Sequence, residues 1–180
     1  MRRIIGIFLS LLIVFAVCIP VYAEAENLGI WSVTEAEDIA EVNQIDSVRG
    51  AAAALKAQGG GSYSFETDVS AENAYTIGFS ILFYDFHAAR AIAVSGQDAV
   101  RIDKSGNITV FSEETGMMAQ PNRWYDIKIC VNPAKNSYSV DWDDENILGS
   151  TELLALDGCT VKFLDTDVKG SMMLLTNPVV

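Results

Sequence analysis

Apolar and polar residues alternate along most of the chain from Ser62 onward. In the segment 75–83, aromatic and branched residues occupy every second position, and Thr76, Gly78 and Ser80 lie between them. A period of two residues is the mark of a strand that has one face against a core. The alternation therefore predicts about nine strands, at 63–69, 75–83, 91–95, 99–103, 107–112, 124–131, 137–142, 160–164 and 171–175.

The segments between these strands contain residues that favour tight reversals of the chain. Glycine, asparagine, aspartate or proline occurs at 95–98, 104–107, 132–136 and 157–158, and these residues tolerate the dihedral angles of turns. Short strands separated by such turns are typical of an antiparallel sandwich or barrel. The pattern predicts an all-β domain made of two antiparallel sheets.

The strand at 124–131 gives the sharpest prediction of which residues face the core. Its apolar positions Tyr125, Ile127, Ile129 and Val131 share one face, which we expect to be buried. Asp126 and Lys128 lie on the opposite face and are expected in solvent.

The residues before Ser62 show a different pattern. Thr34-Glu35-Ala36-Glu37 is a capping box, and Ile39, Val42 and Ile45 follow at helical spacing, which predicts a short N-terminal helix from Glu35 to about Asp46. The segment Ala51–Ala57 fits two structures. Its alanines and Leu55 favour a helix by propensity, whereas the glycines on either side of it would equally bound a strand.

Residues 1–23 have the three parts of a secretory signal peptide. Arg2 and Arg3 precede the apolar run Ile4–Ile19, and Val21-Tyr22-Ala23 provides small or apolar residues for cleavage. An uncleaved anchor is the alternative, because the run is only slightly shorter than the roughly 18 to 20 residues of a membrane-spanning helix. We expect cleavage after Ala23, one secreted or extracellular domain at 24–180, and no stable insertion in a membrane afterwards.

Charge limits the partners of this mature chain. It keeps 10 basic and 24 acidic residues, a net charge of −14, because the signal peptide removes two of the 12 basic residues and no acidic one. Such a negative field disfavours nucleic acids, and it also disfavours polyanionic sugars unless a bound cation intervenes. Neutral glycans remain compatible with the composition.

Two cysteines, Cys130 and Cys159, remain after the signal peptide is removed. An oxidising compartment would permit a disulfide between them. Two separate thiols are the alternative, since pairing depends on a distance that the sequence does not give. Thiol catalysis is not expected, because His87 is the single histidine and no thiol lies near it in the sequence.

The segment 122–133, NRWYDIKICVNP, is followed by KNSYSVD at 135–141. Together they resemble the paired strands of concanavalin A-like jelly-roll domains, which have a tryptophan-tyrosine pair, alternating apolar residues, a turn with asparagine or aspartate, and tyrosine-x-valine. Residues 91–111 also resemble the short hairpins of this family, so the likeness covers most of 62–141. It implies a jelly-roll sandwich of the kind found in carbohydrate-binding modules, glycosidases and lyases of secreted bacterial proteins.

The sequence also departs from this family in two places. Residues 141–146 form an acidic turn where the family commonly has a short aspartate-glycine hairpin. The closing segment 172–180 lacks the aspartate-asparagine pair that often holds calcium there.

The acidic turn is the main candidate for chemistry. On a continuous strand, Asp141, Asp143 and Glu145 would share one face, as the paired acids of glycosidases require. The simpler interpretation is a solvated hairpin tip that breaks the strand. Asp143, Asp144 and Asn146 are also candidate ligands for calcium, the one cofactor that the sequence suggests, since oxygen ligands suit this hard cation.

Sugar binding requires an exposed aromatic ring beside polar groups. Trp124 and Trp31 are expected in the core, so Trp142, beside Asp141 and Asp143, is the candidate for stacking on a sugar. The alternative for Trp142 is a core residue that continues the face of Tyr138 and Val140.

A second candidate for sugar binding is the end of the strand at 75–83. There Tyr84, Asp85 and His87 offer a ring, a carboxylate and an imidazole at the rim of a sheet. An ordinary strand end is the alternative, because a single histidine without a partner makes a poor metal site or triad.

Three functions fit an exported domain of this kind. The first is a secreted, non-catalytic module that binds a neutral glycan or other cell-surface material. The second is a glycan-degrading hydrolase or lyase that uses the acidic cluster 141–145. The third is a structural or adhesive surface protein. We prefer the first, and the site must decide because the fold is common to all three.

Overall fold

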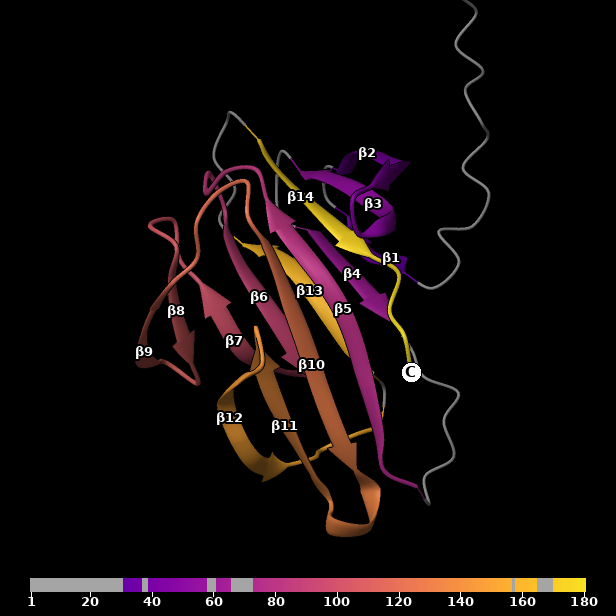
Figure 1. The fold of residues 1–180 in the computed structure, drawn as a ribbon, viewed down its shortest axis with the longest axis vertical. Helices are drawn as coiled ribbons and strands as arrows, with labels where there is room; N and C mark the ends of the chain where they lie inside the picture. The colour runs from indigo at the N-terminus through magenta and orange to yellow at the C-terminus, as the bar shows by residue number, and fades with distance from the viewer. Residues whose placement is uncertain (1–30, 37–38, 58–60, 66–72, 157, 165–169) are drawn as a thin grey trace, which may run out of the picture.

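The computed structural model describes residues 31–36, 39–57, 61–65, 73–156, 158–164 and 170–180. These residues form fourteen strands in two stacked antiparallel sheets of seven strands each. Figure 1 shows the long strands β5 and β10 of one sheet lying across β13 and β6 of the other. The predicted antiparallel sandwich is confirmed. The signal peptide lies outside the described residues, so its cleavage stays a prediction.

We call the two sheets A and B. In sheet A the strand order is β1 (Ser32–Ala36), β4 (Gly61–Phe65), β13 (Cys159–Leu164), β6 (Ala89–Val94), β7 (Gln97–Ile102), β8 (Asn107–Val110) and β9 (Glu113–Met118). In sheet B it is β12 (Glu145–Glu152), β11 (Ser137–Trp142), β10 (Trp124–Asn132), β5 (Tyr75–Phe83), β14 (Ser171–Thr176), β3 (Gly50–Ala57) and β2 (Ile39–Ser47). One 3-10 turn, Pro133–Lys135, joins β10 to β11.

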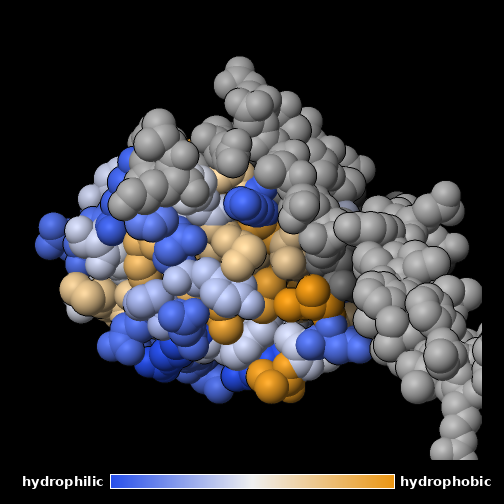
Figure 2. Space-filling model, turned by 90° about the horizontal axis from the view of Figure 1, so that it is seen from above, coloured by the Kyte–Doolittle hydropathy of each residue, from blue (hydrophilic) through white to orange (hydrophobic). Residues whose placement is uncertain are grey.

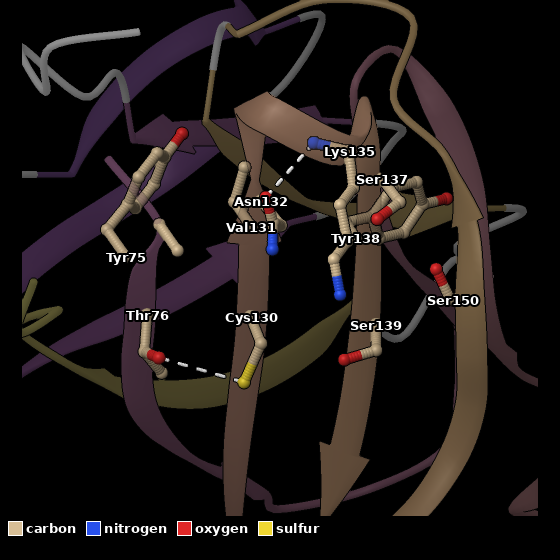
Figure 3. Close-up of a pocket in the computed structure, with 11 residues that line it drawn as sticks. Tyr75, Thr76, Cys130, Val131, Asn132, Lys135, Ser137, Tyr138, Ser139 and Ser150 are labelled. Atoms are coloured by element: carbon tan, nitrogen blue, oxygen red, sulfur yellow. Dashed lines mark hydrogen bonds between the residues drawn. The ribbon is translucent and has the colours of Figure 1, made fainter. Parts of the chain in front are cut away.

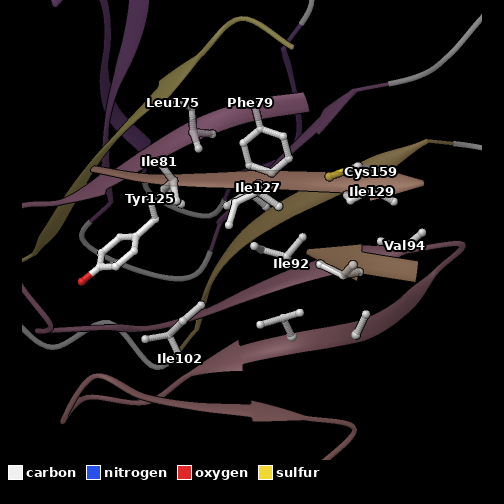
Figure 4. Close-up of a cluster of buried hydrophobic side chains, with 14 of the residues drawn as sticks. Phe79, Ile81, Ile92, Val94, Ile102, Tyr125, Ile127, Ile129, Cys159 and Leu175 are labelled. Carbon is white, nitrogen blue, oxygen red and sulfur yellow. The ribbon is translucent and has the colours of Figure 1, made fainter. Parts of the chain in front are cut away.

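The hydrophobic core fills the space between the two sheets. Ile81 and Ile127 of sheet B meet Ile92, Val94 and other apolar side chains of sheet A there (Figure 4). Along β10, the expected core positions are at most 3% exposed, whereas Lys128 is exposed on the opposite face. The predicted alternation of this strand is therefore confirmed.

The N-terminal residues form strands, and the helix predicted from Glu35 to Asp46 is wrong. In β2, Ile39 lies opposite Ala57 and Val42 lies opposite Leu55 of β3, with a bulge between Ile39 and Glu41. The bulge adds one residue to β2. The helix-like spacing of Ile39, Val42 and Ile45 therefore comes from an irregular strand. The same pairing makes 50–57 a strand.

The pattern of alternation also missed two edge strands. In β9 no residue is buried, and in β12 only Leu148 is buried. A strand at the edge of a sheet has one neighbour and little contact with the core. Its apolar residues are therefore too few to produce a visible period of two.

The two cysteines lie on opposite sides of sheet B, one in the core and one facing outward, and both are free thiols. Cys159 is part of the core, whereas Cys130 alternates with the core residues Ile129 and Val131 and so faces outward from sheet B. Burial raises the pKa of the Cys159 thiol, which keeps it protonated and unreactive.

None of the described residues belongs to a helix that is long and apolar enough to cross a membrane.

Candidate functional site

The outward face of sheet B carries a row of polar and aromatic side chains along β10. Trp124, Asp126, Lys128, Cys130 and Asn132 occupy alternate positions on this face. Because a strand rises about 3.3 Å per residue, the row is about 26 Å long. We call this surface the β10 face.

A charged cluster lies near one end of the β10 face. Arg49, in the turn between β2 and β3, donates from one guanidinium nitrogen to both carboxylate oxygens of Asp126, at 2.6 and 2.7 Å. The Ser80 hydroxyl of β5 donates to the same carboxylate at 2.6 Å. A hollow of about 550 Å³ opens beside this cluster, with Lys128 and Thr176 also in its lining.

Asp126 is ionised in this setting. Burial raises the pKa of Asp126, but the hydrogen bonds from Arg49 and Ser80 and the positive charges of Arg49 and Lys128 outweigh it. The pKa of Asp126 therefore lies below its ordinary value. An ionised carboxylate beside a guanidinium offers acceptors and donors close together, which suits a ligand rich in hydroxyl groups.

Trp124 stands next to the charged cluster, two residues before Asp126 on the same face. It is half-buried and packs against a small apolar group on the outer side of sheet B that includes Leu82 and Leu174. The expectation that Trp124 belongs to the main core is therefore wrong. Its position alternates with that of the buried Tyr125, so the indole lies on the outward side of the sheet.

Trp142, the residue expected to stack on a sugar, is in the core. It is 1% exposed, and its ring lies 5.0 Å from the ring of Tyr125 and 6.4 Å from that of Phe83. The exposed position is wrong, and the alternative, that Trp142 continues the face of Tyr138 and Val140, is confirmed. Trp142 keeps the inward orientation of alternate residues in β11, and the acidic turn begins after it.

The acidic turn is a two-residue hairpin loop. Trp142 lies opposite Glu145, and Asp143 and Asp144 both have positive φ, 50° and 64°, as a type I′ turn requires. The chain therefore reverses between Asp141 and Glu145. The arrangement of three carboxylates on one face of a continuous strand is wrong, and the predicted hairpin tip that breaks the strand is correct.

The side chains of this hairpin bind their neighbours on β10. Asp143 accepts from Arg123 at 2.9 Å and from the backbone N–H of Asp126 at 2.8 Å. Asp144 forms an ion pair with Lys128. These contacts fix the hairpin beside the charged cluster, and they pair the charges of Asp143 and Asp144 with basic side chains.

The proposed calcium ligands are not assembled around a common point. Asp143 and Asp144 each have a basic partner, and Asn146 directs its amide nitrogen to Asp141 at 2.7 Å. An amide nitrogen donates hydrogen bonds and is not a calcium ligand. Within the described ranges, no group of three or more His, Cys, Asp or Glu side chains is placed to hold a metal ion. Calcium binding stays a prediction.

A second, smaller hollow lies at the other end of the β10 face. Figure 3 shows its small polar lining, in which Thr76 donates to the thiol of Cys130 and the backbone N–H of Lys135 donates to Asn132. The hollow has a volume of about 330 Å³, and Ser137 and Ser139 of β11 also line it. Both hollows thus open on the same face.

The segment that follows β5 has a structural role in the sandwich. Asp85 accepts hydrogen bonds from the Ser171 hydroxyl and from the backbone N–H groups of His87 and Met172, both at 3.0 Å. Its carboxylate lies 3.6 Å from the guanidinium of Arg90. Asp85 therefore fastens the start of β14 to the loop after β5, whereas Tyr84 keeps an exposed ring.

Arg90 is fully buried at this end of the sandwich. Its guanidinium lies between the rings of Phe83 and Phe163, 5.6 and 5.0 Å from their centres, and donates to Ser171 at 2.6 Å. Burial lowers the pKa of Arg90 to about 10, while Asp85 raises it. Seen from above, the described surface shows apolar residues interspersed with hydrophilic ones (Figure 2). Arg90 ties the two sheets together.

We expect Asp85 to make the protein less stable in acid. Burial raises its pKa, but hydrogen bonds from Ser171, His87 and Met172 outweigh it, so the folded pKa lies below the unfolded value. Its contribution is present above about pH 4 and is lost as pH falls through the folded pKa. Asp85→Asn should lower the free energy of unfolding at pH 7 and should make this free energy depend less on pH. Urea unfolding at pH 7 and pH 3 measures both effects. The exposed Asp46→Asn is the control, and equal behaviour of the two variants would contradict this role.

Sequence reasoning missed Arg49 and Ser80 as site residues, although it placed Asp126 on the outward face. Arg49 is 77 positions from Asp126, and no local pattern joins them. Position in the alternation was the one available signal: it puts Trp124 on the face of Asp126, although we expected Trp124 in the core.

No model of a protein family matches the sequence, and no curated protein matches it. Solved structures do match the fold. A sialidase gives a TM-score of 0.55 at 10% identity over 84% of this chain, which spans 17% of the sialidase. The carbohydrate-binding module CBM66 from Bacillus subtilis gives 0.52 at 15% identity, over 84% of this chain and 95% of the module. The catalytic domain of a GH131 beta-glucanase from Podospora anserina gives 0.54 at 10% identity, over 77% and 78%.

These likenesses agree with the arrangement of the strands. They establish the fold, and at such identities they do not establish the activity. The chain is a jelly-roll sandwich of the concanavalin A-like type.

Proposed function

We propose that this protein is an exported, non-catalytic module that binds a neutral glycan on the β10 face. The observation that carries the proposal is the cluster of Arg49, Ser80 and Asp126 in the lining of a hollow. The half-buried Trp124 lies two positions from Asp126 on the same face of β10. An indole can stack on the apolar side of a sugar ring, while carboxylate and guanidinium groups pair with its hydroxyls.

The charge of the β10 face favours a neutral ligand. Arg49 pairs with Asp126, Lys128 with Asp144, and Arg123 with Asp143. A surface of paired charges has little net field to attract a polyanion or a polycation. Its donors and acceptors remain close together, and these are the groups that a hydroxyl-rich ligand uses.

The similar structures support a carbohydrate ligand at the level of the fold. One of them is a carbohydrate-binding module and another is a glucanase domain. The predicted signal peptide adds the extracellular location in which such modules work.

The pKa of Asp126 suits a hydrogen-bond acceptor better than a general acid. A hydrolase needs a general acid whose pKa is raised. Burial raises the pKa of Asp85, Asp103 and Asp126, but hydrogen bonds outweigh burial in each, and all three lie below their ordinary values. A hydrolase or lyase is the alternative, and release of reducing sugar or of an unsaturated product would support it.

A glycan array followed by calorimetry tests the proposal. The full chain is applied to neutral glycans with and without calcium, and Trp124→Ala and Asp126→Asn are then titrated with a glycan that binds. Loss of a stacking ring worth about 1 kcal/mol should weaken binding about fivefold, and loss of the charged acceptor should weaken it at least as much. Glycan binding that requires calcium would support the predicted calcium site.

The control is Asp98→Asn on the outer side of sheet A. Asp98 also forms an ion pair, with Lys162 at 2.8 Å, so it matches Asp126 in chemistry and differs in place. Its glycan affinity should equal that of the unaltered chain. Absence of binding to every neutral glycan, or an equal loss in Asp98→Asn, would refute the proposed site.

A further inference from the structure

A groove lies between the edge strands β9 and β12. β9 ends sheet A and β12 ends sheet B, and residues of β12 and of the β8–β9 hairpin line a cavity of about 440 Å³. We call it the edge groove. It does not include the residues of the proposed glycan site.

The edge groove exposes apolar side chains. Phe111 is 40% exposed in its lining, while Met117 and Ile147 are half-buried against the core. Phe111 occupies a two-residue hairpin turn with Ser112, at φ values of 46° and 71°. Glycine or asparagine is usual in such turns, and the left-handed conformation costs other residues roughly 1 kcal/mol. The exposed ring is therefore present at a cost to stability.

The charge of the edge groove has a single sign. Glu113, Glu114 and Glu145 line it, and no lysine or arginine does so among the described residues. None of the three carboxylates has an ion pair with another described residue. This contrasts with the paired charges of the β10 face. The unbalanced negative field favours a cationic occupant.

The strands that line the edge groove are open to further pairing. Among the strands of the described residues, each has a neighbour on one side only, so its other edge presents backbone groups that no described strand pairs. Proteins often protect such edges with lysine or proline, and neither residue occurs in β9 or β12. An extended peptide can use these backbone groups while its side chains enter the groove.

We propose that the edge groove binds an extended segment of another protein in which apolar and basic residues alternate. The apolar side chains would pack on Phe111, Met117 and Ile147, and the basic ones would face the three glutamates. A second copy of this chain fits less well, because its formal net charge of −12 would repel the same groove.

Fluorescence anisotropy with the full chain tests this proposal. The probe is a labelled nine-residue peptide of alternating lysine and valine with blocked ends. The comparison peptides replace lysine with glutamate, or collect the same lysines in one block. The alternating peptide should bind most tightly, and its affinity should fall as salt is raised.

Two variants locate the binding. Phe111→Asn should weaken it about fivefold without lowering the thermal midpoint, since asparagine suits the turn. Glu113→Gln with Glu145→Gln should weaken it about tenfold at low salt. The matched controls are Val48→Ser, which alters an apolar residue 91% exposed elsewhere, and Asp46→Asn with Glu152→Gln, which removes two charges outside the groove.

Each contrary result overturns the proposal. Failure of the alternating peptide to bind would refute it. An equal loss of binding in the control variants and the groove variants would show attraction to overall charge only. Equal affinity for the block peptide would exclude pairing of an extended strand. Sedimentation that shows a dimer, lost in Phe111→Asn, would make a second copy the occupant.

Discussion

Replacing Ile127 with aspartate is expected to unfold the protein or nearly so. Ile127 is 1% exposed in the middle of β10, between β5 and β11, and belongs to the core. The change removes apolar burial and places an unpaired carboxylate between the sheets, at a cost of several kcal/mol. Domains are usually stable by only about 5 to 15 kcal/mol. Urea unfolding followed by circular dichroism measures the loss.

The neighbouring variant Lys128→Asp is the control. It places the same residue one position along the strand, where the side chain is exposed. It removes the ion pair with Asp144, a surface contact of small value. The unfolding midpoint should therefore change little. Equal losses in Ile127→Asp and Lys128→Asp would show that the faces of β10 are assigned incorrectly.

Truncation of Trp142 is expected to cost roughly 3 to 5 kcal/mol of stability, as large buried aromatic residues do. Its ring packs between Phe83 and Tyr125 in the core. Any Trp142→Ala protein that remains folded should keep its affinity for a bound glycan, because the indole does not reach the surface. Thermal unfolding and calorimetry on the same sample measure the two quantities.

Trp124→Ala should behave in the opposite way. Its indole lies on the outward side of sheet B, so the change should reduce glycan affinity more than stability. The two tryptophan variants thus distinguish a core residue from a surface residue. A loss of affinity in Trp142→Ala with unchanged stability would contradict the positions of both rings.

Alternation predicted the central part of the fold because central strands bury a complete face. Residues 75–83 and 124–131 have neighbours on both sides, so each inward position must be apolar. Edge strands lack this constraint, and β9 and β12 went undetected. The helix expected at 35–46 followed from local capping and spacing, and pairing with β3 overrode these local preferences.

The site was less predictable than the fold. The phase of β10 already put Trp124 on the side of Asp126, and the phase of β11 put Trp142 beside the buried Tyr138 and Val140. Strict use of alternation would have assigned both tryptophans correctly. The partnership of Asp126 with Arg49 depends on the crossing of distant strands, which no sequence pattern contains.

The place of β14 in sheet B determines when this chain can finish folding. β14 lies between β3 and β5 and pairs with both, so Thr176 lies opposite Ala52. Until β14 pairs with both neighbours, β2 and β3 have no strand to join them to the rest of sheet B. Pairing over so long a sequence separation closes slowly. Completion of sheet B therefore waits for the docking of β14 between β3 and β5.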